Sequence, residues 1–198
     1  EIEKSVFQHF MLKEIMNQQD SIQDSLRGRI NINHQVKLGG LEIVHQDKPL
    51  IHHLSQAQKI ILVACGTSLH AGIVGKYIME ELADIPVDVE QASEFRYRHK
   101  SIPQNTVIIG ISQSGETADT LEAVKSLKKE CLCLGICNVV ASSLSHITEG
   151  GVYLHVGPEI GVASTKAFTG QLSILYLLAI KLAQIKKINE EKSIKICI

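Results

Sequence analysis

Strand-like apolar runs alternate with helical patterns along most of this chain, and this alternation limits its fold more than any other feature. Residues 59–64 read KIILVA, and further runs occupy residues 87–90, 106–111, 131–137 and 151–156. A strand that is apolar at successive positions is covered on both faces, as in parallel sheets flanked by helices. The sequence therefore predicts an α/β three-layer sandwich, in which a five-stranded parallel sheet of flavodoxin-like type has helices on both faces.

Helical periodicity fills the intervals between these runs. The apolar positions that mark the helices are Ile73, Tyr77 and Leu82; Leu121, Val124 and Leu127; and Phe168, Leu172, Leu175, Ala179 and Leu182. Near the start, Phe7, Met11 and Ile15 predict one or two helices that end near Gly28. We expect a helical arm over residues 1–57, the α/β domain over 58–186, and a tail or linker over 187–198.

Charge and composition exclude several classes of function. The formal net charge of −1 gives no basic surplus for nucleic acid, and 4% aromatic residues without tryptophan argue against a base-stacking platform. The chain has no G-x-x-x-x-G-K-[ST] and no G-x-G-x-x-G, so we expect no nucleotide cofactor. The apolar run at residues 174–180 is far shorter than the roughly 20 residues of a membrane span, so no membrane partner is expected.

The cysteines point to a reducing compartment. All but Cys197 of the five lie in strand-like runs, and we interpret them as buried, reduced thiols of a cytoplasmic protein. The spacing of Cys131, Cys133 and Cys137 would put three thiols on one strand face, whereas zinc sites favour loops with C-x2-C spacing. No metal is expected.

Small hydroxyl residues and glycines crowd three strand-to-helix turns. They are residues 65–68 (CGTS), 112–117 (SQSGET) and 161–166 (GVASTK). Ligands of open parallel sheets bind at the carboxyl ends of the strands. A helix's first turn there offers unpaired N–H groups and partial positive charge, hydroxyls add donors, and glycine lets the backbone close around an anion. The turns predict a phosphate cradle; the alternative is that their serines and threonines only cap helices.

Three charged or titratable residues lie in these turns or directly after them. Glu116 would repel a phosphate, so its side chain is expected to turn towards the sugar ring, a neighbouring loop or a subunit partner. Lys166, the cation of the three turns, either supports the anion or is an ordinary surface lysine. His70 either faces the site or lies on the surface; sequence order alone decides neither case.

The turns, together with residues 92–98 (ASEFRYR) and 9–15 (HFMLKEI), resemble the sugar isomerase (SIS) domain family. More narrowly, they are similar to the first SIS domain of the glutamine–fructose-6-phosphate aminotransferase (isomerising) family, also called glucosamine-6-phosphate synthases. The resemblance implies the following sites: phosphate-binding Ser112, Gln113, Ser114 and Thr117; sugar-binding Thr67, Ser68, Val162, Ala163 and Ser164; and supporting Gly66, Gly115, Glu116 and Lys166.

The same resemblance implies what the chain binds and what it lacks. The ligand would be fructose 6-phosphate or glucosamine 6-phosphate, and the partners a glutaminase domain and a second SIS domain of the same enzyme, in a homodimer. The family's proton-shuttling groups, ring-opening histidine and Schiff-base lysine lie in parts not found here, so we expect a catalytically incomplete fragment with no catalytic residue. The alternatives are a freestanding SIS sensor of sugar phosphates, a dimerisation module, or a small phosphosugar isomerase.

Overall fold

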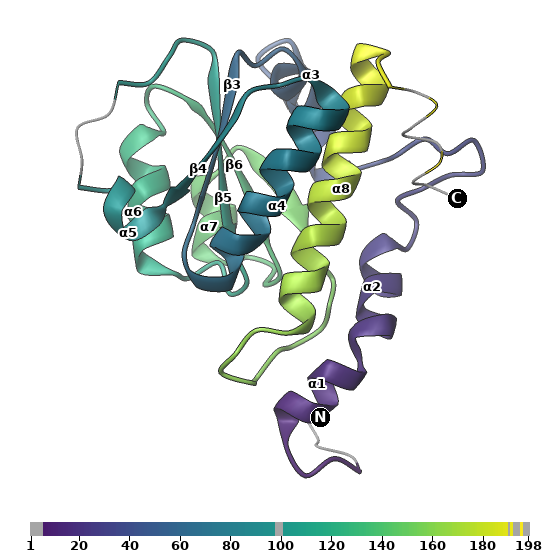
Figure 1. Ribbon diagram of the computed structural model, residues 1–198. Coiled ribbons are helices and arrows are strands. Elements are labelled where there is room, and N and C mark those ends of the chain that lie inside the picture. The colour runs from purple at the N-terminus through teal and green to yellow at the C-terminus, as the bar shows by residue number, and fades with distance from the viewer. Residues whose placement is uncertain (1–5, 98–100, 190, 192–194, 196–198) are drawn as a thin grey trace.

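The computed structural model describes residues 6–97, 101–189, 191 and 195. Its main sheet is parallel throughout, with strand order β4-β3-β5-β6-β7 (Figure 1). The strands are β3 (Lys59–Ala64), β4 (Val87–Gln91), β5 (Thr106–Ser112), β6 (Leu132–Cys137) and β7 (Gly150–Tyr153). The predicted five-stranded parallel sheet is confirmed, although the last strand ends at Tyr153, three residues before the predicted end.

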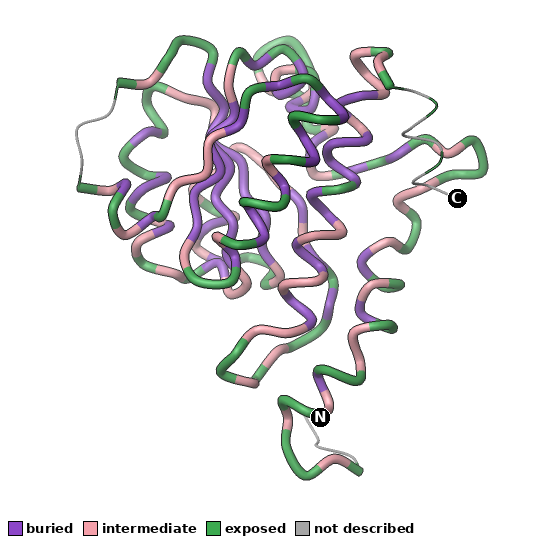
Figure 2. Tube along the Cα trace, viewed as in Figure 1, coloured by how far each residue is buried: buried purple, intermediate pink, exposed green. Residues whose placement is uncertain are grey.

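Helices cover both faces of this sheet, which explains its apolar strands. The helices α4 (Gly66–Ala83) and α8 (Lys166–Lys186) pack on one face; α5 (Ala92–Phe95), α6 (Ala118–Leu127) and α7 (Ser143–Ile147) pack on the other. Every residue of β5 is buried, and the strands form the buried centre of Figure 2. Each face has its own apolar cluster, so the sheet separates two cores.

The helix α4 is present as predicted, but of the three residues that predicted it only Leu82 is buried. Ile73 and Tyr77 are exposed, at 39% and 66%, whereas Gly72 and Gly75 are buried. A Cβ added to Gly75 would stand 2.9 Å from a Leu175 methyl group, so the glycine allows α4 and α8 to approach closely. Small residues such as Gly72 and Gly75 therefore share the packed face of α4 with the large apolar residues Ile78, Met79 and Leu82.

The N-terminal arm has two parts with different packing. Its elements are α1 (Phe10–Met16), α2 (Gln18–Leu26), η1 (Gly39–Leu41), β1 (Val44–His45), β2 (Lys48–Pro49) and α3 (Leu50–Ser55). Of the predicted one or two helices the structure has two, α1 and α2, and they extend away from the sheet beside the start of α8 (Figure 1). Leu38, Leu41 and Leu54, in contrast, are at most 2% exposed and belong to the main core.

The helix α8 is the longest element of the described chain. By length and composition alone it is able to cross a membrane, with a mean hydropathy of 1.4. More than half of that window, 56%, is buried inside this protein against α4, α2 and the sheet, which accounts for its composition. Most of the predicted tail, residues 187–198, lies outside the described residues.

Candidate functional site

The topology brings two of the three predicted turns together. From β3 the chain moves to β4 on one side and later to β5 on the other, so the sheet's switch point lies between β3 and β5. Ligands of doubly wound sheets bind at this point, outside the carboxyl ends of the strands. Turn 65–68 follows β3 and turn 112–117 follows β5, whose residues Ala64 and Ile111 are paired. The two turns therefore stand side by side at the switch point.

The turn after β5 is closed by its own hydroxyl groups. The buried Ser112 Oγ lies 2.8 Å from Thr117 Oγ1 and accepts a hydrogen bond from the Gly115 amide at 3.0 Å. Ser114 Oγ accepts a hydrogen bond from the Glu116 amide at 3.1 Å. Gly115 has φ +69°, and a Cβ there would overlap the side chain of Ser142. The loop therefore has a fixed shape that only glycine permits at its tightest point.

The helices that follow these two turns begin without a side-chain cap. Thr117 occupies the N-cap of α6, yet its hydroxyl bonds Ser112 and makes no capping hydrogen bond. Cys65 occupies the N-cap of α4, also without a side-chain capping bond. Two helix N-termini with unpaired N–H groups thus open at the switch point, an arrangement that attracts anions. The interpretation that Thr117 merely caps α6 is wrong.

The third turn differs from this arrangement because a carboxylate already occupies it. Glu159 Oε1 accepts hydrogen bonds from the amides of Thr165 at 2.7 Å and Ala167 at 3.2 Å, at the start of α8. Glu159 Oε2 accepts one from Ser164 Oγ at 3.0 Å. The N-terminus of α8 is thus neutralised from within, while Val162 and Ala163 remain exposed at the loop's tip.

Glu116 turns to a neighbouring loop, one of the three orientations expected for it. Its Oε1 accepts a hydrogen bond of 2.8 Å from the amide of Ser143, at the start of α7. Hydrogen bonds from Ser143 hold the pKa of Glu116 below its ordinary value. This carboxylate therefore fixes α7 against the turn.

Lys166 is buried, so the interpretation as a surface lysine is wrong. The residue is 7% exposed, and its Nζ lies 3.6 Å from the place where a Cβ on Gly157 would stand. Among the described residues, its Nζ has no hydrogen-bond or ion-pair partner. An ammonium on a largely buried side chain, without a counter-ion among the described residues, favours an anion nearby. Thr67 and Gly66 are exposed at the start of α4, and Ser68 is buried and accepts a hydrogen bond from Gln171 Nε2 at 2.9 Å.

The sequence reasoning missed Asn138, which joins the loops of this edge. Its amide donates to the Gln113 carbonyl at 3.0 Å, its Nδ2 donates to the Gly157 carbonyl at 2.7 Å, and its Oδ1 accepts from the Val156 amide at 3.1 Å. Asn138 directly follows β6, and no site residue was predicted at the carboxyl end of that strand. A polar residue directly after the fourth apolar run was the available signal.

The remaining sequence expectations concern histidine and cysteine. His70 is exposed. The described cysteines are free thiols; Cys133 and Cys137 are buried as expected, while Cys65 and Cys131 are only half-buried. Burial raises the pKa of Cys133 to about 12, which makes it a poor nucleophile. No cluster of three potential metal ligands occurs within the described part of the chain, and Cys197 lies outside it.

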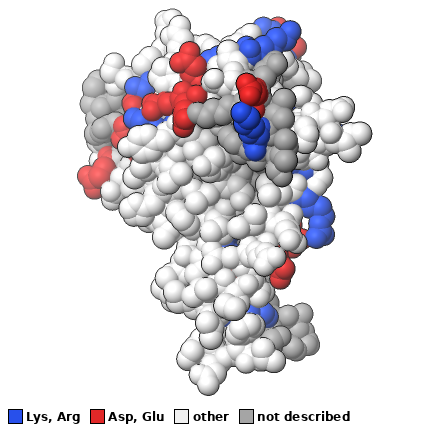
Figure 3. All heavy atoms as spheres, turned by 45° about the vertical axis from the view of Figure 1, so that its right-hand side comes forward, with Lys and Arg blue, Asp and Glu red and all other residues white. Residues whose placement is uncertain are grey.

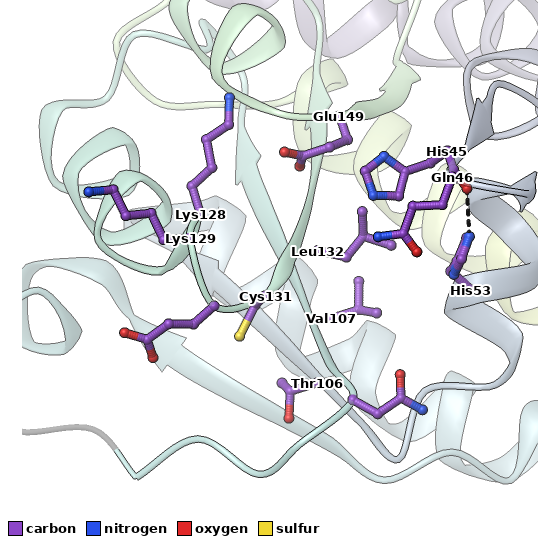
Figure 4. Close-up of a pocket in the computed structure, with 12 residues that line it drawn as sticks. His45, Gln46, His53, Thr106, Val107, Lys128, Lys129, Cys131, Leu132 and Glu149 are labelled. Atoms are coloured by element: carbon purple, nitrogen blue, oxygen red, sulfur yellow. Dashed lines mark hydrogen bonds between the residues drawn. The ribbon is translucent and has the colours of Figure 1, made fainter.

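A cavity of about 340 Å³ lies at the opposite edge of the sheet (Figure 4). It is lined by the first residues of β5 and β6, by His45 and His53 of the arm, and by Lys128 and Lys129. His53 Nε2 lies 2.9 Å from the His45 carbonyl, and Figure 4 shows the Lys129 side chain pointing away from both histidines. None of the predicted site residues lines this cavity.

Comparison with known proteins supplies independent findings. The SIS domain family matches residues 53–181. The chain is 49% identical over 193 residues to the glutamine–fructose-6-phosphate aminotransferase (isomerizing) of Chlorobaculum tepidum and 50% over 192 residues to that of Bacteroides thetaiotaomicron. Each match covers 96% of this chain and 30% of the relative, so the chain spans about a third of these relatives' length. The C-terminal domain of glucosamine-fructose-6-phosphate aminotransferase from Francisella tularensis superposes with a TM-score of 0.90 at 36% identity, over 99% of this chain and 54% of that one.

Proposed function

This chain belongs to the SIS domain family, and we propose that it is the fructose-6-phosphate-binding part of a glutamine–fructose-6-phosphate aminotransferase. The observation that carries the proposal is the pair of uncapped helix N-termini, those of α4 and α6, at the switch point. The family relationship names the ligand class, and the two open N-termini provide a place for a dianionic phosphate without a basic surface.

In this proposal, residues 112–117 hold the phosphate. The hydroxyls of Ser112, Ser114 and Thr117, the Gln113 side chain and the first amides of α6 donate to its oxygens. The turn's internal bonds from Ser112 and Ser114 prepare its shape before the ligand arrives. The preformed loop reduces the entropy lost on binding.

The sugar lies over the start of α4, between Thr67 and Ser68 on one side and the tip of the loop at residues 162–164 on the other. Gln171 of α8 donates to Ser68 Oγ and so fixes the orientation of that hydroxyl. Gly66, with φ +57°, allows the tight entry into α4, and the buried Lys166 adds positive charge to the edge. This chain binds and orients the phosphosugar.

The chemistry of amination and isomerisation needs a base near C1 and C2 of the sugar and an amine. In this proposal the glutaminase and second SIS domains of the longer enzyme supply them. The exposed apolar residues Met11, Leu12 and Met16 of α1 provide a surface for the homodimer, in a part of the molecule with few charged side chains (Figure 3). The free thiols favour a cytoplasmic location.

The direct test is calorimetric titration with fructose 6-phosphate, with unphosphorylated fructose as the control ligand. Saturable binding of the phosphosugar alone supports the proposal; a folded chain that binds neither ligand contradicts it. Ser114→Ala and Thr117→Ala should each weaken binding about tenfold or more, because a hydrogen bond to a charged group contributes about 1.5–3 kcal/mol. The exposed Ser101→Ala is the matched control and should bind like the parent chain.

A further inference from the structure

The helix α1 buries an acid and exposes its apolar side chains. Glu14 is 4% exposed and is the only buried residue of α1, whereas Met11 and Ile15 are each 41% exposed. A carboxylate is rarely buried unless hydrogen bonds compensate its lost hydration. The position of Glu14 is therefore explained by the groups that it contacts.

Glu14 contacts the loop that leads into α8. Its Oε1 accepts a hydrogen bond from the Ile160 amide at 2.6 Å, and its Oε2 accepts one from the Gly161 amide at 3.0 Å. A Cβ on Gly161 would stand 2.6 Å from Glu14 Oε2 and 3.5 Å from Met11 Cα. A side chain at position 161 would displace the Glu14 carboxylate, so glycine at this position allows the contact.

The same loop is held at its other end by Glu159. That carboxylate bonds the amides of Thr165 and Ala167 and the hydroxyl of Ser164. The exposed tip, Val162 and Ala163, therefore lies between two carboxylate anchors, of which one is local and one belongs to the N-terminal arm. In the described structure the phosphate loop at 112–117 has its own hydrogen bonds and is hydrogen-bonded to neither anchor. Its link to the other loop runs through Asn138, which bonds Gln113 and, ahead of both anchors, Val156 and Gly157.

We propose that Glu14 is a positioning residue that holds the sugar-contacting loop in place from the N-terminal arm. The inference rests on the proposed function, since that function makes residues 162–164 part of the sugar site. The inference about Glu14 divides the site into two parts. The arm does not set the geometry of the phosphate part, whereas the geometry of the sugar part depends on the arm. A displacement of α1 would withdraw the loop and weaken selection of the sugar while leaving phosphate binding intact.

The first test uses Glu14→Gln, which keeps the side chain's size but places an NH2 group against a backbone N–H. Binding of fructose 6-phosphate should weaken about tenfold or more, because two hydrogen bonds to a charged group are disturbed. Binding of inorganic phosphate should stay within about twofold. The matched control is Asp20→Asn on α2, an exposed carboxylate without a loop contact, which should change neither affinity. A parallel loss of both affinities, or no loss, would overturn the inference.

A second variant changes the loop side of the contact between Glu14 and Gly161. Gly161→Ala inserts a methyl group against Glu14 Oε2 and leaves the arm's sequence unchanged. It should reproduce the split between phosphosugar and phosphate binding. If Gly161→Ala binds the phosphosugar as the parent does, the loop's place does not depend on this contact.

Amide hydrogen exchange without ligand separates this inference from the proposed function. The Ile160 and Gly161 amides should exchange about tenfold faster or more in Glu14→Gln than in the parent and in Asp20→Asn. Unchanged exchange would refute the anchoring, whatever the ligand results. If the parent chain binds neither phosphosugar nor phosphate, the proposed function fails and the positioning role fails with it, while the exchange data still decide whether Glu14 anchors the loop.

Discussion

Gly115→Ala tests whether the phosphate loop has the shape described here. Two penalties act at this position. Alanine at φ +69° costs roughly 1–2 kcal/mol, and its methyl group overlaps the buried Ser142, which adds about 1–3 kcal/mol of overpacking. The free energy of unfolding should therefore fall by about 2–5 kcal/mol, measured by urea denaturation with an unchanged m-value.

Gly28→Ala provides the matched control for the backbone penalty. Gly28 has φ +71° and nothing within 4 Å of its added Cβ, so only the cost of roughly 1–2 kcal/mol applies. Ser142→Gly in the Gly115→Ala background should recover the overpacking part, and the double-mutant cycle isolates it from the cost of changing Ser142 itself. If Gly115→Ala is no more destabilising than Gly28→Ala, or if Ser142→Gly recovers nothing, the reasoning about this loop is refuted.

Two further predictions concern charge. Lys166→Met should leave the free energy of unfolding unchanged or higher, because the ammonium has no partner among the described residues and methionine keeps the buried apolar stem. It should weaken inorganic phosphate binding roughly tenfold, and unchanged binding by calorimetry would remove Lys166 from the site. Glu116 has a pKa lowered by Ser143 in the folded state, so its contribution to stability is present above the ordinary carboxylate pKa and is lost as pH falls through the lowered one. Glu116→Gln should flatten the acid limb of the stability–pH curve measured by denaturation, and an identical curve would contradict the Ser143 contact.

The fold was predictable because its signal is local and repeated. Each continuous apolar run requires cover on both faces, and a run of such strands with helices between them fits few architectures other than a parallel sheet. The two turns at the switch point were predictable for the same reason: glycine and hydroxyl residues directly follow the first and third runs. The exact end of β7 was not, because residues 154–156 continue the apolar pattern after the pairing with β6 stops.

Packing faces and long-range contacts were decided by the tertiary structure. Periodicity selected Ile73 and Tyr77 for the core, but the close approach of α8 favours glycine at position 75, and the close approach of the sheet favours glycine at position 72. Hydrophobic periodicity carries no information about which residue size fits a packed position, because that depends on the distance between elements far apart in the chain.

The sequence by itself determined which elements form and where small polar residues meet helix N-termini. Those properties depend on residues a few positions apart, where backbone propensity and hydrophobic periodicity act. Only the tertiary structure decided that Glu14 reaches Ile160 across 146 residues of chain. Carboxylates accept from any exposed amide, so which amide each one meets depends on how the folded elements are placed in space.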